Sequence, residues 1–535
     1  VRLLYPEING ARAGWDSALD LVARRFSDTI AQHGPDSVAF YVSGQLLTED
    51  YYVANKLMKG FIGSSNIDTN SRLCMASAVA AHVRAFGEDV VPCSYSDLEE
   101  ADLIVLVGSN TAWCHPVVWQ RIEAAREQRG TKLVVIDPRR TETAERADLH
   151  LPISPDGDVA LFNAALLAMK ERGLLDDAYL AAHVNAPDGF WEQLCGGDDG
   201  LDDATRSAFF ALLAAYPRTL TLFSQGANQS ASGTDKGNAI INLHLATGRI
   251  GKPGMGPFSI TGQPNAMGGR EVGGLANMLA AHMSFGPEDC ASAQDFWASP
   301  TIARAPGLNA VDMFRAVHDG RIKAVWIMAT NPAVSMPDAG FVRAAMQRCD
   351  FVVVSDCMAE TDTTAYAHVK LPALAWGEKD GTVTNSERVI SRQRAIFPPP
   401  GEARADWDIV ADVGRRMGCG DAFAYPSPAA VFREYAAQTG FRNAGQRVLD
   451  ISQWADISDK DYDAWAPWQW GGVSSYADAC YSTPDGKARL MAVTPPAQDT
   501  DPAFPLRLNT GRTRDHWHTM TRTALSPKLS QHRRE

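Results

Sequence analysis

Residues 101–140 read ADLIVLVGSNTAWCHPVVWQRIEAAREQRGTKLVVIDPRR, and this stretch decides the fold class. It contains two short runs rich in Val, Ile and Leu, separated by a helical pattern that begins near His115. Near-continuous apolar runs are typical of parallel strands that are buried on both faces. The same kind of run recurs at residues 37–45, 219–229, 322–332 and 350–360. This alternation predicts an α/β protein with open, doubly wound parallel sheets.

Each predicted strand ends in small or amide-bearing residues. Examples are Gly108-Ser109-Asn110, Asp137-Pro138-Arg139 and Thr330-Asn331-Pro332. Open α/β sheets bind ligands at the carboxyl ends of their strands, where such residues allow close backbone approach and present N–H groups to phosphate. A weak internal repeat pairs LIVLVGSN and VVIDPRR with AVWIMATN and VVVSDCM. We therefore expect a large nucleotide-bearing ligand, or two related nucleotide sites on one chain.

The composition excludes several classes of protein. A chain of 535 residues, of which 45% are hydrophobic, is long enough for more than one domain. Its net charge of −13 argues against a nucleic-acid partner, which would need basic stripes. The sequence contains no run of about 18 apolar residues, so we expect no membrane span. Nine cysteines without a C-x-x-C pair predict neither a disulfide framework nor a Cys-rich metal site in these residues, and favour a reducing, cytoplasmic location.

Three later segments depart from the α/β rhythm. Residues 248–274 are rich in glycine but also carry Met, Phe, Gln, Asn and Arg, which predicts an ordered loop against a ligand rather than a flexible linker. The Pro-rich residues 395–405 predict a connection between sub-domains. Residues 431–502 predict an irregular connector, and a new strand is expected from Phe504, over the sequence LRLNTGR.

One cysteine stands out by its context, SNIDTNSRLCMASAV at residues 65–79. A lone cysteine is usually a small buried hydrophobe. Cys74, however, follows a polar turn and opens a helical pattern, and a helix N-terminus lowers the pKa of a thiol. The thiolate of Cys74 is therefore expected to act as a nucleophile or as a ligand of a soft metal. The residues alone leave both a cysteine hydrolase and a metal site open.

The pattern N-x-x-x-C-M-A-S, from Asn70 to Ser77, resembles the molybdenum-ligand segment of the nitrate-reducing branch of the dimethyl-sulfoxide-reductase family. Four further segments resemble assimilatory nitrate reductases: YVSGQLLTEDYYVANKLMKGFIGSSNIDTN, GSNTAWCHP, GPFSITGQPNAMGGREVG and LNTGRTRDHWHTMTR. The resemblance covers essentially the whole chain. It implies a molybdenum held by two molybdopterin guanine dinucleotides and by Cys74, and the reduction of nitrate to nitrite by oxygen-atom transfer.

The resemblance also implies four groups of cofactor-binding residues. Residues expected near the pterins are Gln45 and Asn70, with Thr510, Gly511, Arg512, His516, Trp517, His518 and Thr519 from a loop of the C-terminal domain. Gln225, Asn228 and Gln229 are expected to form a cofactor-binding turn between domains. One dinucleotide is expected on Gly108, Ser109, Asn110, Thr111, Asp137, Pro138, Arg139, Arg140, Pro155, Asp156 and Asp158. The other is expected on Asn331, Ser355, Asp356, Lys379 and Asp406. Taken alone, the His516/His518 pair also fits a simple metal site, and Asp137 also fits a helix cap.

Two residues are candidates for the substrate site. Nitrate is an anion, so a cation must attract and position it. Arg270 is the candidate because it lies in the Gly-rich MGGREVG segment that the family folds over the metal, and a surface arginine is its alternative. Glu88 is the candidate for a residue near the substrate funnel.

The resemblance implies a discontinuous domain organisation. A molybdopterin domain is expected at residues 1–72 and 290–430, with an inserted dinucleotide-binding domain at 73–289 that carries Cys74. The start of a C-terminal, β-barrel-like dinucleotide domain is expected at 503–535. The family's [4Fe–4S] cluster has no cysteine motif within these residues, so we expect the chain to be part of a longer protein. Its electron donor is expected to be a ferredoxin, a flavodoxin or an NADH-dependent reductase subunit.

Three alternatives remain open. A formate dehydrogenase of the same family usually has His after the metal ligand, whereas Met75 follows Cys74 here. The sequence separates a periplasmic nitrate reductase from an assimilatory one only by overall similarity. A non-catalytic structural subunit on the same fold is disfavoured because Cys74 and both sets of nucleotide loops are present.

Overall fold

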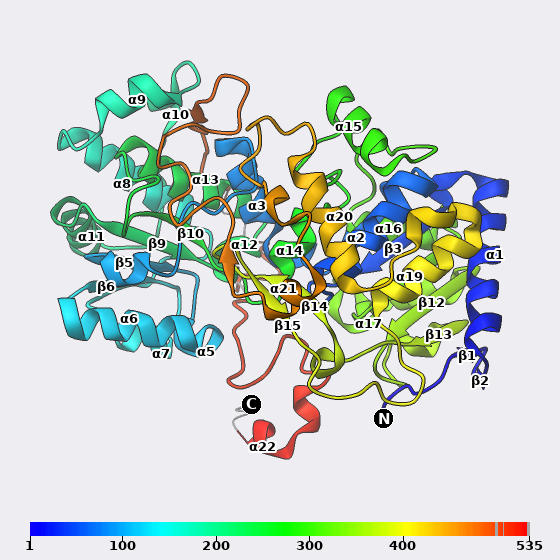
Figure 1. Ribbon diagram of the computed structural model, residues 1–535. Coiled ribbons are helices and arrows are strands. Elements are labelled where there is room, and N and C mark those ends of the chain that lie inside the picture. Colours follow the sequence, from blue (N-terminus) through cyan, green and yellow to red (C-terminus); the bar gives the residue numbers. More distant parts are fainter. Residues whose placement is uncertain (498–500, 507, 532–535) are drawn as a thin grey trace. The chain divides into compact units, whose positions relative to one another are not determined.

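The computed structural model describes residues 1–497, 501–506 and 508–531, and its elements are labelled in Figure 1. The chain forms two compact units: unit 1 is Val1–Leu73 with Gln263–Trp470, and unit 2 is Cys74–Gly262 with Gly471–Glu535. The chain changes from unit 1 to unit 2 between Leu73 and Cys74. The return to unit 1 comes at residue 263 rather than 290, and residues 431–470 belong to unit 1 rather than to a separate connector.

Unit 1 is built on a largely parallel sheet. Its strand order is β2-β1-β13-β12-β11-β3-β4. The strands are β1 (Glu7–Ile8), β2 (Ala11–Arg12), β3 (Val38–Val42), β4 (Ile67–Thr69), β11 (Ala324–Met328), β12 (Phe351–Asp356) and β13 (Val369–Pro372). Strands β3, β4, β11, β12 and β13 are parallel, whereas β1 pairs antiparallel with β13 and β2 at the edge. The chain leaves β3 for β4 on one side and later adds β11 on the other, so the winding direction reverses between β3 and β11.

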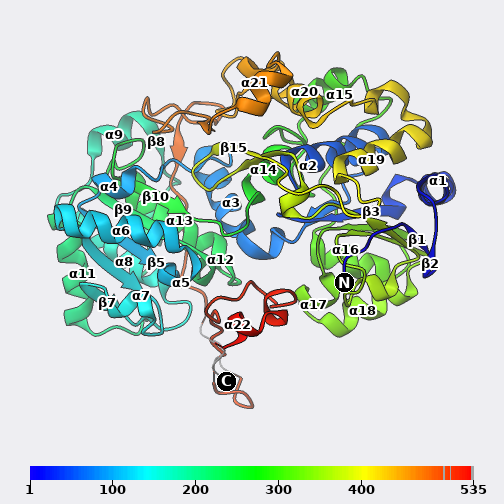
Figure 2. The same ribbon diagram turned by 60° about the horizontal axis from the view of Figure 1, so that its bottom comes forward.

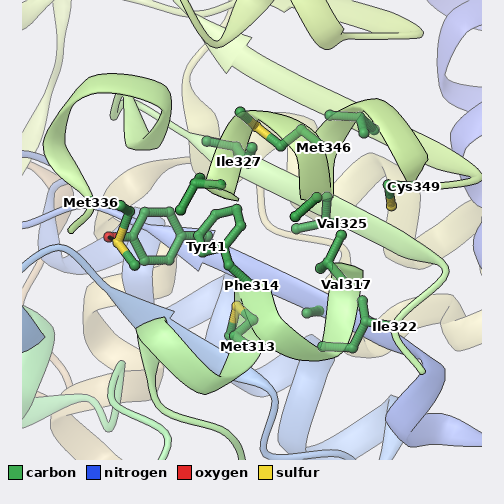
Figure 3. Packing of buried hydrophobic residues seen from close by; sticks show 14 of the residues in the cluster. Tyr41, Met313, Phe314, Val317, Ile322, Val325, Ile327, Met336, Met346 and Cys349 are labelled. Atoms are coloured by element: carbon green, nitrogen blue, oxygen red, sulfur yellow. Dashed lines mark hydrogen bonds between the residues drawn. The ribbon is translucent and has the colours of Figure 1, made fainter. Parts of the chain in front are cut away.

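Successive side chains of the unit 1 strands point into two hydrophobic cores, one on each face of the sheet. Helices α16 (Ala310–His318) and α18 (Ala339–Arg348) lie together on one face of the sheet (Figure 2). Figure 3 shows Tyr41 of β3 in that core, where its ring lies 5.2 Å from Phe314 and its hydroxyl donates to Met336 Sδ at 3.2 Å. The adjacent Phe40 faces the other way and packs at 5.9 Å against Phe26 of α1 (Trp15–His33). Burial on both faces confirms the prediction from the apolar runs.

Unit 2 has a second, wholly parallel sheet of order β10-β9-β5-β6-β7. Its strands are β5 (Leu103–Val107), β6 (Lys132–Ile136), β7 (Leu149–Leu151), β9 (Thr219–Phe223) and β10 (Gly256–Ser259). Figure 1 shows α6 (Pro116–Arg129) on one side of this sheet and α8 (Asp158–Glu171) with α13 (Gly233–Ala246) on the other. The winding direction reverses between β5 and β9, which is where doubly wound sheets bind their ligands.

The remaining elements connect and cover these sheets. Unit 1 also contains α2 (Thr48–Asn55), a π-helix (Lys56–Ile62), α14 (Ala266–Glu271), α15 (Pro287–Trp297), α17 (Pro332–Ser335), α19 (Asp406–Gly414), α20 (Pro428–Gly440), α21 (Asp459–Ala464) and a small antiparallel sheet of β14 (Gly381–Thr384), β15 (Val389–Gln393) and β16 (Trp468–Gln469). Helix α3 (Arg72–Phe86) begins in unit 1 and continues in unit 2. Unit 2 adds α4 (Asp97–Glu100), α5 (Thr111–Cys114), α7 (Glu142–Glu145), α9 (Asp177–His183), α10 (Phe190–Gln193), α11 (Asp203–Ala215), α12 (Gln225–Asn228), α22 (Pro527–Ser530) and the paired β8 (Val184–Asn185) and β17 (Ala488–Arg489).

Two expectations about irregular segments have clear outcomes. The Gly-rich residues 248–274 are ordered, and they include β10 and α14. The strand expected from Phe504 was wrong: the described residues from 501 onward form only an isolated bridge and two short helical turns. Leu506 and Leu508 are exposed there, and a strand needs a neighbouring strand to satisfy its backbone groups.

Two further features of the structure concern its cysteines and the length of its apolar helices. All nine cysteines are free thiols. Among the residues that the structure describes, no helix is both long enough and apolar enough to cross a membrane.

Candidate functional site

Cys74 lies in the first turn of α3, beside a break in the helix. The backbone of Met75 is not helical (φ −146°, ψ 22°), so regular helix starts after it. The side chain of Cys74 is 5% exposed, and its sulfur accepts a hydrogen bond from Gln225 Nε2 at 2.7 Å. An amide donor stabilises the thiolate form of a cysteine. The predicted site residues Cys74 and Gln225, which lie far apart in the sequence, are thus in direct contact.

The turn that carries Gln225 is fixed to α3 at a second point. Ser77 Oγ donates to the carbonyl oxygen of Asn228 at 2.8 Å. Gln225 and Asn228 are the first and last residues of α12, which follows β9. The end of β9 therefore holds Cys74 in place.

The loops after β5 and β9 meet through two glycines. The amide of Gly226 donates to the carbonyl oxygen of Gly108 at 2.9 Å. A Cβ added at Gly108 would lie 2.6 Å from the Cα of Gly226, and Gly108 has a φ of +55°. Only glycine permits this approach. The loops meet at the point where the winding of the sheet reverses.

A cavity of about 640 Å³ opens beside these loops, at the carboxyl edge of the unit 2 sheet. Its volume is typical of a site for a large ligand. Most of the predicted residues of this unit line it: Gly108, Ser109, Asn110, Asp137, Pro138, Arg139, Pro155, Asp156, Asp158, Gln225, Gln229, Thr510, Gly511, Arg512, His516, Trp517 and His518. The structure therefore brings the expected dinucleotide loops and the expected pterin loop of unit 2 to one cavity.

Six predicted residues of unit 2 do not line the cavity: Cys74, Glu88, Thr111, Arg140, Asn228 and Thr519. Thr111 is buried beneath it, with its hydroxyl 2.9 Å from that of Ser109, and Asn228 supports α3. Arg140 and Thr519 lie outside the lining. Glu88, the candidate for the substrate funnel, accepts a hydrogen bond from Ser482 Oγ at 2.6 Å and is likewise outside it.

Lys236 is a cavity residue that the sequence did not single out. Its side chain is 3% exposed, and its ammonium lies 2.9 Å from Asp156 and 2.8 Å from Asp158. Burial lowers the pKa of Lys236, but the two carboxylates outweigh burial and raise the pKa above its ordinary value. The lysine belongs to α13. The signal in the sequence that could have identified it is its place in the segment GTDKG, a few residues after the predicted Gln229.

Two polar atoms of the C-terminal loop are buried at this cavity and have no hydrogen-bond partner among the residues that the structure describes. They are Arg512 Nε and His516 Nε2. His516 Nδ1 is already paired with Thr523 Oγ1 at 3.0 Å, so only Nε2 is available to a ligand. Burial, and secondarily Arg512, lowers the pKa of His115 in the lining to about 4, so this imidazole is neutral at pH 7. Buried polar groups normally have partners, so the two orphaned atoms indicate a polar ligand.

In unit 1, Asn70 ties together the loops at the carboxyl ends of three strands. Its Oδ1 accepts from the amide of Gly44 at 3.0 Å and from Gln263 Nε2 at 3.3 Å. Its Nδ2 donates to Thr330 Oγ1 at 3.3 Å. Gln45, its predicted companion, follows Gly44 in the same loop. Both residues therefore lie where the winding of this sheet reverses.

The other predicted residues of unit 1 have structural partners. Lys379 is buried, and its ammonium lies 2.6 Å from Asp406 and 3.0 Å from Asp50. Asp406 Oδ1 is buried and has no hydrogen-bond partner within the described ranges of the chain. Asn331 Oδ1 accepts from Thr363 Oγ1 at 2.7 Å, Ser355 Oγ accepts from Trp326 Nε1 at 2.8 Å, and Asp356 Oδ1 accepts from the amide of Met358 at 2.9 Å.

Arg270 is buried rather than a surface arginine. It belongs to α14, is 2% exposed, and its Nη2 lies 2.9 Å from Met267 Sδ. The adjacent Glu271 is also buried and accepts hydrogen bonds from Trp470 Nε1, Thr384 Oγ1 and Tyr435 OH at 2.7, 2.9 and 3.1 Å. The guanidinium of Arg270 therefore belongs to an ordered interior segment.

Comparison with known proteins places these sites in context. Residues 2–416 match the family model described as molybdopterin oxidoreductase. The chain is 54% identical to a nitrate reductase of Klebsiella oxytoca, over 99% of this chain and 62% of that protein, and 40% identical to one of Synechocystis sp., over 99% and 78%. It thus spans less than two thirds of the Klebsiella relative. Acetylene hydratase from Pelobacter acetylenicus has a similar fold, with a TM-score of 0.72 at 19% identity, over 91% of this chain and 69% of that one.

Proposed function

The chain belongs to the molybdopterin oxidoreductase family, and from this premise we propose that it forms the larger part of an enzyme that reduces nitrate to nitrite. One observation carries the proposal. Gln225 lines the cavity of unit 2 and donates to the sulfur of Cys74. The only cysteine with the expected metal-ligand context is therefore one hydrogen bond away from the expected cofactor loops.

The residues of the unit 2 cavity fit a molybdopterin guanine dinucleotide. The loops after parallel strands offer backbone N–H groups to phosphates. Asp137, Asp156 and Asp158 supply carboxylates able to accept from guanine or ribose, and the orphaned Arg512 Nε and His516 Nε2 supply polar atoms. Burial raises the pKa of Asp137 above its ordinary value, consistent with a carboxyl that needs a donor from a ligand.

Unit 1 supports a second dinucleotide at the carboxyl edge of its own sheet. Asn331 follows β11, and Ser355 and Asp356 end β12, as Asn110 and Asp137 follow β5 and β6 in unit 2. Asp406 Oδ1 is the orphaned acceptor there, and Lys379 holds the other oxygen of that carboxyl. Two similar sites agree with the internal repeat.

When bound, the cofactor would supply oxygen-atom-transfer chemistry, in which nitrate, two electrons and two protons give nitrite and water. Cys74 would donate its thiolate to the metal, and Gln225 would orient that sulfur and disperse its charge. Arg270 would bind the anionic substrate through charge-assisted hydrogen bonds. Sequestration of Arg270 from water strengthens such bonds.

Features of the whole protein stay predictions. These are a cytoplasmic location, an iron–sulfur cluster that accepts electrons, the identity of the donor protein and the role of Glu88.

The test uses the full-length protein that contains this chain. It should hold molybdenum and reduce nitrate with a reduced viologen dye, and formate oxidation should be much slower. Cys74→Ala should abolish nitrate reduction while the far-ultraviolet circular dichroism stays unchanged. Cys349→Ala is the matched control, since it removes a buried thiol from a hydrophobic core of unit 1. Full nitrate reduction by Cys74→Ala, or formate oxidation in place of nitrate reduction, would contradict the proposal.

A further inference from the structure

Lys59 is a fully buried lysine whose ammonium lies among backbone carbonyls. Nζ donates to the carbonyl oxygens of Gly273 at 2.5 Å and Leu275 at 3.0 Å, and also to that of Met278. The carbonyl of Leu279 lies 3.5 Å away. An ammonium has three donors, and three short contacts use all of them. The side chain thus gathers one loop, residues 273–279, around a single positive charge.

Among the described residues, no carboxylate forms an ion pair with Lys59. The surroundings are apolar, because Leu279, Met283 and Trp297 belong to a buried hydrophobic cluster and Phe285 packs beside it. Burial lowers the pKa of Lys59 below its ordinary value. Carbonyl dipoles that point at the nitrogen favour the charged form, as they do for a bound monovalent cation. The carbonyl oxygens of residues 273–279 therefore surround Lys59 Nζ as they would surround a bound monovalent cation.

The loop that Lys59 gathers is directly attached to Arg270. The amide of Gly273 donates to the carbonyl oxygen of Arg270 at 3.0 Å, and the carbonyl of the same glycine accepts from Lys59. Gly273 has a φ of +89°, and an added Cβ would lie 2.5 Å from the carbonyl oxygen of Leu279. Two hydrogen bonds thus connect the ammonium of Lys59 to the backbone of Arg270.

A second side chain from the same helical segment, that of Asn55, also donates hydrogen bonds to carbonyl oxygens of this loop. Asn55 Nδ2 donates to the carbonyl oxygens of Val272 at 2.7 Å and Leu279 at 2.9 Å. Asn55 ends α2 and Lys59 lies in the π-helix that continues it, four residues later and on the same face. π-Helical turns are frequent at functional sites. Both residues hold the segment that follows α14.

We propose that Lys59 is a positioning residue for Arg270, the cation expected to bind the substrate. The ammonium of Lys59 fixes residues 273–279 and thereby holds Arg270 in place to bind the anion. This inference rests on the proposed function of Arg270. Its structural part, the internal cation that orders the loop, does not depend on the substrate.

The structural part is tested by amide hydrogen exchange on the full-length protein. Lys59→Met keeps the side-chain length but removes the charge and all three donors. Exchange of the amides in residues 269–283 should accelerate on the order of tenfold or more, because opening the loop no longer breaks these bonds. Lys59→Gln, which keeps one N–H₂ group, should lie between Lys59→Met and the wild type, and it serves if Lys59→Met does not fold. Unchanged exchange in that segment would overturn the proposal.

Lys56→Met is the matched control. It also removes a buried ammonium, but Lys56 Nζ donates to Ala422 O, Tyr425 OH and Glu434 Oε1 at 2.7, 2.8 and 2.6 Å. Its effect on exchange should fall on residues 420–436. Equal acceleration at 269–283 in both variants would mean that the effect is general destabilisation, and would overturn the specific role of Lys59.

The functional part is tested by kinetics at saturating dye. Lys59→Met should lower kcat/KM for nitrate on the order of tenfold, mainly through KM, since small displacements of a positioned group cost this much or more. In an Arg270→Ala background, Lys59→Met should have little further effect. Additive effects, or a loss confined to kcat with unchanged KM, would overturn the proposal. If the wild type does not reduce nitrate, the proposed function fails, while the exchange experiment still decides whether Lys59 orders the loop.

Discussion

Glu49 is a buried carboxyl without a cation partner among the described residues, and its titration should govern the stability of unit 1. Its Oε1 accepts from Thr382 Oγ1 and Tyr462 OH, both at 2.8 Å, and its Oε2 accepts from the amide of Thr382 at 2.8 Å. Burial raises the pKa of Glu49 from 4.5 to about 7, although these three hydrogen bonds oppose the rise. Folding therefore favours the protonated form.

The sign and size of the effect follow from this pKa. The stabilisation from protonated Glu49 is fully present below pH 4.5, and it is lost as the pH rises through about 7. Each pH unit between these values costs about 1.4 kcal/mol. The wild type should therefore lose roughly 3 kcal/mol of stability from this residue alone between pH 4.5 and pH 8.

Glu49→Gln removes the titration but keeps the shape of the side chain. The amide places a donor opposite the amide of Thr382, which costs roughly 1–3 kcal/mol at every pH. The difference between the two proteins should nevertheless change with pH. Relative to the wild type, Glu49→Gln should gain roughly 3 kcal/mol between pH 4.5 and pH 8, or roughly 6 °C in Tm.

The assay is thermal unfolding of both proteins across this pH range, at constant ionic strength. Glu378→Gln is the control, because Glu378 is paired with Arg2 at 2.7 Å and its pKa lies below its ordinary value. That variant should differ from the wild type by a constant amount above pH 5. Parallel curves for Glu49→Gln and the wild type would refute the argument that burial of Glu49 dominates.

Three further predictions concern the sites. Arg270→Ala should lower kcat/KM for nitrate by roughly 1.5–3 kcal/mol, ten- to a hundredfold, and Arg270→Lys should recover only part because it lacks the planar fork; steady-state kinetics that match the wild type would leave Arg270 a structural residue. Gln225→Leu should remove the hydrogen bond to Cys74 and lower kcat on the order of tenfold with molybdenum retained, as judged by metal analysis and the molybdenum EPR signal; an identical signal would exclude the contact. Lys236→Met should leave the buried Asp158 and the half-buried Asp156 without their cation, and guanine nucleotide released on denaturation should fall well below the wild-type amount; full retention would make Lys236 dispensable for the cavity.

The sequence predicted the sheets well because the apolar runs carry most of the information. All six runs became buried parallel strands, since a strand covered on both faces needs apolar side chains at nearly every position. Gly108, Asn110 and Asp137, in the turns after these strands, line the cavity, and their contact with a dinucleotide stays a prediction. Cys74 was distinguished by a resemblance; the structure shows its contact with Gln225, and its role as a metal ligand stays a prediction.

The sequence could not predict the features that depend on distant pairing. Lys59 and Lys236 look like ordinary helical lysines, and only the fold shows that one meets carbonyls of residues 273–278 and the other meets Asp156 and Asp158. The strand expected from Phe504 has a suitable local pattern, but a strand requires a partner that local sequence does not reveal. The return of the chain to unit 1 at residue 263 was missed because the Gly-rich segment runs through the boundary without a change in composition.

The interleaving of the two units has a consequence for biosynthesis. Val38 of β3 pairs with Ala324 of β11, so the ribosome must translate all of residues 74–262 before the central pair of the first sheet can form. At about 5–20 residues per second, β3 waits roughly 15–60 s with an apolar, unpaired edge. The sheet of the second unit, whose strands all lie between residues 103 and 259, can pair earlier. The inserted unit should therefore fold first on the nascent chain, while β3, which precedes Cys74, keeps one edge unpaired until β11 emerges.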